Sequence, residues 1–203
     1  MRPMRPSNAP NVGGYHAIVL AAGAGSRFGG GKMLASWEGR PLVRAATGIA
    51  LSAPVDTVTV VVGGDADRIA AALSDVADLR LRVVHAADWR TGLSASLRAG
   101  IAALPADARG ALVFLGDMPR VPPTSGAALL AALDAGAPAA TVSVEGKPAH
   151  PVALSARLFS GVAALTGDRG ARVLLAGIDG VVDLPSEDAG ATFDVDSAAD
   201  LSG

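Results

Sequence analysis

The sequence predicts an α/β fold in which a mostly parallel, Rossmann-like sheet lies between two layers of helices. Short apolar runs alternate with stretches of helical spacing from Tyr15 to about residue 138, and this alternation is typical of parallel strands joined by right-handed crossovers. The length of 203 residues suits one domain with a substantial core. We therefore expect a three-layer α/β/α domain over residues 15–203.

The expected elements follow from the apolar spacing. Strands are predicted over His16–Ala22, Asp56–Val62, Leu81–His85 and Ala111–Leu115, and helices over Pro41–Ser52, Asp65–Leu73, Ser94–Leu104 and Pro123–Leu133. Beyond residue 138 we expect a hairpin-like pair, Ala139–Val144 and Pro151–Leu154, then helices near Ala156–Leu165 and Ala171–Ala176 and short strands near Val181 and Phe193. Ligands of such sheets bind beyond the carboxyl ends of the strands, so the loops after Leu20, Val62, His85 and Leu115 are the expected site.

Composition excludes several classes of function. The formal charge of -2 and the aromatic share of 3% disfavour nucleic acid as the main ligand, because phosphate backbones need cations and single-stranded bases need stacking surfaces. The absence of cysteine excludes disulfides, thiolate metal sites and cysteine nucleophiles. No apolar run reaches the roughly 18 residues of a membrane span. We expect a soluble cytoplasmic protein, with oxygen-ligated cations still open.

The amino-terminal segment, residues 1–14, reads as a disordered leader rich in Arg, Pro, Asn and Gly. The apolar run Ala17–Ala24 behind it imitates the core of a signal peptide and ends in small residues. Cleavage at that point would remove the first predicted strand and half of a glycine loop. We therefore favour a leader in front of a cytoplasmic domain.

A glycine-rich loop follows the first predicted strand, from Leu20 to Lys32. It lacks the third glycine of a dinucleotide fingerprint, where Phe28 stands, and the Gly and Ser/Thr positions of a P-loop. Five glycines nevertheless leave backbone N–H groups accessible, and Arg27 and Lys32 add two cations. Since the chain has 15 arginines and only two lysines, lysine is not its ordinary surface charge. The combination favours a polyphosphate ligand.

Five ordered motifs then resemble the nucleotidyltransferases related to the molybdenum-cofactor guanylyl- and cytidylyltransferases. These are the Leu-Ala-Ala-Gly-x-Gly-x-Arg-x-Gly-x-x-Lys run from Leu20, Gly116-Asp117-Met118-Pro119, Lys147-Pro148-Ala149-His150-Pro151, the segment from Gly167 to Arg172, and Asp194-Val195-Asp196-Ser197. The resemblance implies the fold of the nucleotide-diphospho-sugar transferases. It also implies transfer of a nucleoside monophosphate from a nucleoside triphosphate to a phosphorylated acceptor, with molybdopterin favoured and pyrophosphate released.

The resemblance also assigns roles. Asp117 and Asp196 would share Mg²⁺, although period-two spacing places Asp194 on the same face as Asp196 and does not separate them. Arg27, Lys32 and Asp117 would be catalytic, with Arg27 and the loop amides on the β- and γ-phosphates and Lys32 on the α-phosphate. The nucleotide-binding set would be Leu20, Ala21, Ala22, Gly23, Gly25, Arg27, Lys32, Gly63, Ser94 and Ser96. His150 would contact the acceptor, and Asp168 is expected to cap the following helix.

The partner expectations come from the same source. Ala22 stands where cytidylyl-transferring relatives have alanine and guanylyl-transferring ones have glycine, so CTP is preferred over GTP. A molybdenum enzyme or its chaperone is the implied protein partner. Three alternatives remain: a sugar- or polyol-phosphate acceptor, a pigment-reducing oxidoreductase, and a non-catalytic nucleotide-binding or cofactor-delivery protein.

Overall fold

A seven-stranded sheet forms the centre of the computed structural model, which describes residues 13–23, 25 and 28–202. The strand order is β5-β4-β1-β6-β8-β7-β9. The pairs β4–β5, β1–β4, β1–β6 and β7–β9 are parallel, whereas β8 is antiparallel to both β6 and β7. The predicted fold class is confirmed. Most of the predicted leader, residues 1–12, lies outside the described residues.

The elements of the first half fall close to their predicted positions. The strands are β1 (Tyr15–Ala21), β4 (Thr57–Val62), β5 (Leu81–His85) and β6 (Gly110–Leu115), and the helices are α1 (Leu42–Ser52), α2 (Ala66–Leu73), α3 (Leu93–Ala102) and α4 (Ser125–Asp134). The second half contains β7 (Ala139–Val144), β8 (Lys147–Ser155), α5 (Phe159–Ala163), α6 (Ala171–Leu175) and β9 (Val182–Pro185). The hairpin is therefore present, with a second strand that begins earlier than expected.

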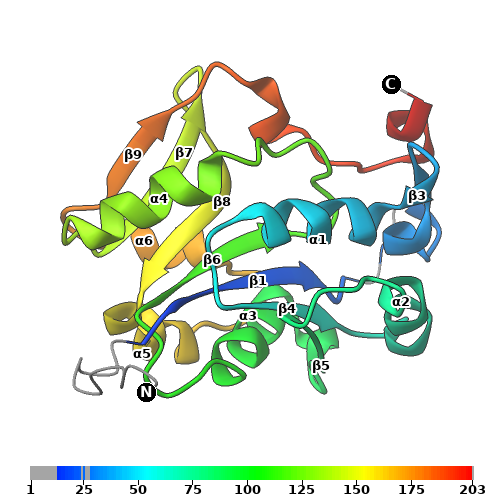
Figure 1. The fold of residues 1–203 in the computed structure, drawn as a ribbon, viewed down its shortest axis with the longest axis horizontal. Helices are drawn as coiled ribbons and strands as arrows, with labels where there is room; N and C mark the ends of the chain where they lie inside the picture. Colours follow the sequence, from blue (N-terminus) through cyan, green and yellow to red (C-terminus); the bar gives the residue numbers. More distant parts are fainter. Residues whose placement is uncertain (1–12, 24, 26–27, 203) are drawn as a thin grey trace, which may run out of the picture.

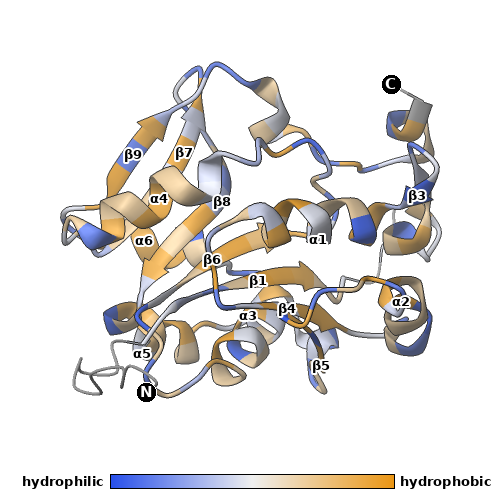
Figure 2. Cartoon of the chain, in the orientation of Figure 1, coloured by the Kyte–Doolittle hydropathy of each residue, from blue (hydrophilic) through white to orange (hydrophobic). Residues whose placement is uncertain are grey.

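Each face of the sheet carries its own apolar core (Figure 1). On one face, Val43 and Ala46 of α1, Ile69 of α2 and Leu129 of α4 pack on the sheet. On the other face the cluster includes Leu97 of α3, Val162 of α5 and Leu175 of α6. In Figure 2 the central strands β1 and β6 are mostly hydrophobic, whereas β9 at the edge of the sheet carries a hydrophilic segment. Because β1, β4 and β6 are covered on both sides, they are buried along almost their whole length, including the polar His16 and Thr59.

Because β8 is antiparallel to β6, the first residues of β8 lie near the carboxyl end of β6. In the β6–β8 register, Val113 is opposite Val152, so the residues before Val152 run toward the carboxyl end of β6. The peptide bond between His150 and Pro151 is cis. The β6–β8 register therefore brings the start of the Lys147–Pro151 motif to the end of the sheet at which Asp117 follows β6.

One predicted strand is wrong. No strand forms near Phe193; a short 3₁₀ helix, η5 (Ala189–Thr192), precedes an extended segment of residues 193–196. That segment is held by a loop rather than by a neighbouring strand, because Val195 N–H donates to the Asp117 carbonyl at 3.0 Å. It passes beside the small hairpin of β2 (Ser36–Trp37) and β3 (Arg40–Pro41), which lies close to the carboxyl terminus in Figure 1.

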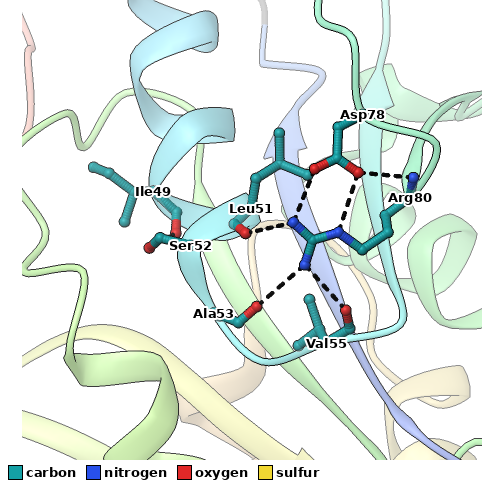
Figure 3. Close-up of polar contacts among 7 residues, drawn as sticks. All are labelled: Ile49, Leu51, Ser52, Ala53, Val55, Asp78 and Arg80. Atoms are coloured by element: carbon teal, nitrogen blue, oxygen red, sulfur yellow. Dashed lines mark hydrogen bonds and ion pairs between the residues drawn. The ribbon is translucent and has the colours of Figure 1, made fainter.

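At the other end of α1, Arg80 joins three parts of the chain (Figure 3). Its guanidinium donates to the carbonyl oxygens of Leu51, Ala53 and Val55 at 2.8, 3.5 and 3.3 Å, and it pairs with Asp78 at 2.8 Å. These carbonyls lie at the last turn of α1 and in the loop after it, where a helix leaves acceptors unsatisfied. Arg80 therefore closes α1 and fixes its connection to β4.

Among the described residues, no helix is both long enough and apolar enough to cross a membrane.

Candidate nucleotide and metal site

The glycine loop after β1 turns the chain so that Lys32 returns to the strand ends. Gly25 has φ +57°, and its carbonyl accepts the N–H groups of Phe28 and Gly30 at 2.9 and 3.1 Å. A Cβ at Gly25 would lie 2.9 Å from the Cβ of Lys32. The position therefore suits glycine both for its backbone and for its space. The candidate Arg27 lies outside the described residues, as do Ala24 and Ser26.

Lys32 lies between two carboxylates that are distant in sequence. Its Nζ donates to Asp117 Oδ2 at 2.7 Å and to Asp196 Oδ1 at 3.5 Å. The Lys32 side chain is 10% exposed, that of Asp117 21% and that of Asp196 60%. The structure thus brings together the lysine of the first motif and carboxylates of the second and fifth.

Asp194 belongs to the same electrostatic environment. Burial, followed by the negative charges of Asp196 and Asp117, raises the pKa of the Asp194 carboxyl, and the nearby Lys32 acts in the opposite direction. Asp200 holds the backbone beside it: its Oδ2 accepts the N–H groups of Asp196 and Ser197 at 3.0 and 2.7 Å. Two carboxylates therefore contact one lysine, a third is close enough to be affected by their charges, and Asp200 holds the backbone of Asp196.

The donor set fits a hard divalent cation. Among the described residues no group of three or more His, Cys, Asp or Glu side chains has the spacing of a complete metal cage. Asp117 and Asp196 nevertheless converge on one compact cation, Lys32 Nζ. Mg²⁺ is held by one or two carboxylates together with substrate phosphate and water. Two convergent aspartates are therefore enough to fit it.

A cavity of about 670 Å³ opens beside Asp117. Five of the predicted site residues line it: Leu20, Ala22, Gly23, Ser96 and Asp117. It is also lined by residues that the motif reading had not assigned to the site, namely Met33, Trp89, Arg90, Gly92, Leu93, Leu115 and Asp168. The cavity spans the carboxyl ends of β1 and β6, as expected for an open parallel sheet.

Five described residues of the predicted nucleotide-binding set do not line this cavity: Lys32, whose contacts are given above, and Ala21, Ser94, Gly63 and Gly25. Ala21 is 2% exposed and packs in the core, and the buried Ser94 Oγ accepts from Arg98 Nη1 at 3.3 Å. Gly63 lines a neighbouring cavity, also of about 670 Å³. Gly25 shapes the loop around Lys32, as described above.

Trp89 separates the two larger cavities, both of which it lines. A Cβ at Gly63 or Gly64 would lie 2.8 Å from indole atoms, so these glycines make room for the ring. The Arg90 guanidinium lies 4.4 Å from the ring centroid. The Gly63-Gly64 pair between an apolar strand and an acidic helix start was the available sequence signal for this packing.

Asp168 does not cap the helix that follows it. The N-cap of α6 is Gly170, which makes no side-chain capping hydrogen bond, and Asp168 instead lines the main cavity. Gly92 explains this placement: at φ +117°, a Cβ there would lie 2.4 Å from the Gly167 carbonyl carbon and 2.7 Å from Asp168 Oδ1. The close approach of the two loops turns Asp168 toward the cavity.

A smaller cavity of about 180 Å³ lies on the other side of Leu115, and His150, Arg172 and Asp194 help to line it. Burial, then the charge of Arg172, lowers the pKa of His150 to about 4, with a hydrogen bond to the Val113 backbone acting in the opposite direction. His150 Nδ1 is buried without a hydrogen-bond partner among the described residues. The imidazole is therefore neutral at pH 7 and retains one free nitrogen.

Comparison with known proteins places most of the chain in one family of transferases. Residues 17–183 match the model of the MobA-like NTP transferase domain. The "Bifunctional protein GlmU" of Sphingopyxis alaskensis is 35% identical over 143 residues, which is 67% of this chain and 30% of that protein. The chain therefore spans about a third of the length of this curated relative.

Solved structures extend the likeness to almost the whole chain. Rv0371c from Mycobacterium tuberculosis H37Rv superposes with a TM-score of 0.80 at 26% identity, covering 94% of this chain and 96% of that one. A complex of Rv0371c with manganese gives a TM-score of 0.72 at 25% identity, covering 87% and 89%.

Proposed function

We propose that this chain, which belongs to the MobA-like NTP transferase family, transfers a nucleoside monophosphate from CTP to a phosphorylated small-molecule acceptor. The nucleotidyltransferase class follows from the family. The proposal adds the donor, the acceptor and the residues that act. Its main support is the convergence of Lys32 with Asp117 and Asp196 at the carboxyl edge of the sheet.

The reaction assigned to this site is an in-line displacement at the α-phosphorus. An oxygen of the acceptor phosphate forms a new P–O bond, the bond to the β-phosphate bridge breaks, and pyrophosphate leaves with that electron pair. The acceptor phosphate is already anionic at neutral pH, so no covalent intermediate is needed. Catalysis then consists of positioning and charge stabilisation.

The chain's own residues divide this work. The ammonium of Lys32 supports the charge that builds on the α-phosphate, while Arg27 and the N–H groups of the glycine loop hold the β- and γ-phosphates. Asp117 and Asp196 would hold Mg²⁺, which would supply neutralisation of phosphate charge when bound. Manganese is a second candidate metal, because the similar Rv0371c has been solved in complex with it.

The main cavity is assigned to the nucleoside. Leu20, Ala22 and Gly23 line the side next to the glycine loop, and Ser96 lies on the α3 side. Gly63 and Ser94 remain part of the proposed nucleotide set through their backbones. Ala22 supports CTP over GTP through its likeness to the cytidylyl-transferring relatives.

The smaller cavity is assigned to the acceptor. His150 and Arg172 line it together with Asp194, which is next but one to Asp196 in the sequence. Molybdopterin is the proposed acceptor, which would place a molybdenum enzyme or its chaperone downstream. Sugar- and polyol-phosphates are the alternative acceptors. We place the reaction in the cytoplasm.

Pyrophosphate release tests the proposal directly. Wild-type protein is incubated with Mg²⁺, each nucleoside triphosphate in turn, and either molybdopterin or a panel of sugar- and polyol-phosphates. We expect release that requires an acceptor and is fastest with CTP, and a loss of at least about 100-fold in Asp117→Ala. Acceptor-dependent oxidation of a reduced nicotinamide without pyrophosphate release would contradict the proposal, as would nucleotide binding without turnover for any acceptor.

A further inference from the structure

Arg120 lies beside two aromatic rings that come from distant parts of the sequence. Its guanidinium carbon is 5.0 Å from the centroid of Trp37 and 4.4 Å from that of Phe193. The two rings are themselves 5.6 Å apart with an interplanar angle of 46°. One cation thus contacts both rings, and each contact is within the distance at which a guanidinium is attracted to a π-face.

These three residues belong to the segments that carry the candidate metal ligands. Arg120 follows Asp117 by three residues, and Phe193 precedes Asp194 by one residue and Asp196 by three. Trp37 is 2% exposed and packs with Leu42 and Val195. The rings therefore fix the segment of residues 193–196 against a buried part of the core.

Two backbone contacts reinforce the same junction. The Val195 N–H donates to the Asp117 carbonyl at 3.0 Å. Gly190 packs so closely that a Cβ there would lie 2.1 Å from the Arg120 carbonyl oxygen. The chain around Arg120 thus touches the carboxyl-terminal segment both before and after Phe193.

Arg120 achieves this without neutralising the site. Over the described part of the chain, no carboxylate lies within ion-pair distance of its guanidinium, although Asp117 is three residues away. An arginine that paired with Asp117 or Asp196 would compete with a divalent cation for the same oxygens. Because the Arg120 guanidinium contacts the two rings, it does not pair with these carboxylates.

We infer that Arg120 is a positioning residue: by holding Phe193 against Trp37, it sets the distance of Asp196 from Asp117 and so the affinity of the site for a divalent cation. The inference rests on the proposed function for the role of the two carboxylates. It makes no demand on the identity of the nucleotide or the acceptor.

The test compares three variants of the full chain. Arg120→Met keeps much of the length of the side chain and removes the charge, and Arg120→Lys restores a cation over the rings. Arg109→Met is the matched control, because Arg109 lies 4.7 Å from the Tyr15 ring centroid and pairs with Asp134 at the opposite edge of the sheet. All three are compared by thermal unfolding.

Binding of Mn²⁺ alone, followed by electron paramagnetic resonance, is the first measurement. For Arg120→Met we expect a dissociation constant raised about tenfold, restored to within about threefold by Arg120→Lys and unchanged in Arg109→Met. The metal concentration for half-maximal pyrophosphate release should rise in parallel, while turnover at saturating metal changes little. Equal Mn²⁺ affinity in Arg120→Met and wild type overturns the inference, and so does an equal weakening in Arg109→Met.

Hydrogen exchange of the Val195 amide is the second measurement, and it requires neither metal nor substrate. We expect exchange about tenfold faster in Arg120→Met and unchanged in Arg109→Met. An unchanged exchange rate in Arg120→Met overturns the inference that Arg120 holds this segment in place. A protein that shows the expected shifts in exchange and Mn²⁺ affinity but no transferase activity would instead refute the proposed function alone.

Discussion

Two cation–carboxylate groups at different places in the molecule differ in how fully their charges are matched. Arg80 is saturated: it binds Asp78 and three carbonyl oxygens drawn from the end of α1 and the loop after it (Figure 3). Lys32 contacts Asp117 and Asp196. Burial, and then the charges of these two carboxylates, raise the pKa of the nearby Asp194. All hydrogen-bonding groups of Arg80 have partners, whereas the carboxylates around Lys32 carry an excess of negative charge.

This difference indicates which group is structural and which is a site. A guanidinium with all of its directions occupied has nothing to offer a ligand, and it restrains the chain where α1 leaves acceptors open. Two carboxylates that share a single ammonium, with a third carboxylate nearby, carry more negative charge than the ammonium can balance. Repulsion among these carboxylates therefore remains in the structure, and the cation of a metal–triphosphate would reduce it.

The largest expected effect that would test this contrast is loss of activity in Lys32→Met. We expect turnover to fall about 10³-fold, since the variant lacks the ammonium that supports charge at the α-phosphate. The free energy of unfolding should change by less than about 1 kcal/mol, because Asp117 and Asp196 keep contact with water. Pyrophosphate release and urea unfolding measure the two quantities.

The contrast breaks if Lys32→Met destabilises the fold as strongly as it slows turnover. Lys32 would then be a structural cation like Arg80. Near-normal turnover would remove it from the catalytic set altogether.

A smaller effect of the opposite kind is expected from Arg80→Met. Its three carbonyl partners would lose their protein donor, and stability should fall by about 2 kcal/mol. Turnover should stay within about twofold of wild type, because Arg80 lies outside the cavities that hold the site. The same two assays therefore separate the two cations. Slowed turnover at unchanged stability in Arg80→Met would reverse their assignment.

The sequence predicted most of the sheet because its strands are short apolar or β-branched runs separated by turns, at the edge of the sheet as well as at its centre. The predicted Leu81–His85 and Ala139–Val144 coincide with β5 and β7, and β1, β4 and β6 start or end within one residue of the prediction. The predicted strand near Phe193 is wrong because its apolar residues serve another purpose: Phe193 and Val195 pack on Trp37. A short apolar run does not reveal whether its partner is a strand or a ring.

The candidate site was predictable where its residues occur in motifs and not where they depend on packing. Lys32, Asp117 and Asp196 were named from the sequence. In the structure, an oxygen of each aspartate lies within 3.5 Å of Lys32 Nζ. The cavity-facing position of Asp168 depends on the close approach of Gly92 to Gly167, which no local pattern encodes. Likewise, nothing near Arg120 in sequence indicates the rings that it contacts.

The smallest expected effect sharpens the comparison through pH. Asp78 has its pKa lowered by Arg80, so the Arg80 group stays ionised between pH 7 and pH 5 and contributes no slope there. His150 behaves differently, since burial lowers its pKa to about 4 from an ordinary value of 6.5. Between these values the unfolded chain binds a proton that the folded protein does not, and stability falls as the pH falls.

We therefore expect wild type to lose roughly 1–2 kcal/mol more than His150→Gln between pH 7 and pH 5. Burial also lowers the pKa of His16, but this residue is present in both proteins and its contribution cancels in the difference. Urea unfolding at pH 7, 6 and 5 measures the slopes. Parallel curves would mean that His150 takes up a proton in the folded protein, and that it reaches the acceptor cavity as a cation beside Arg172 rather than as a neutral ring.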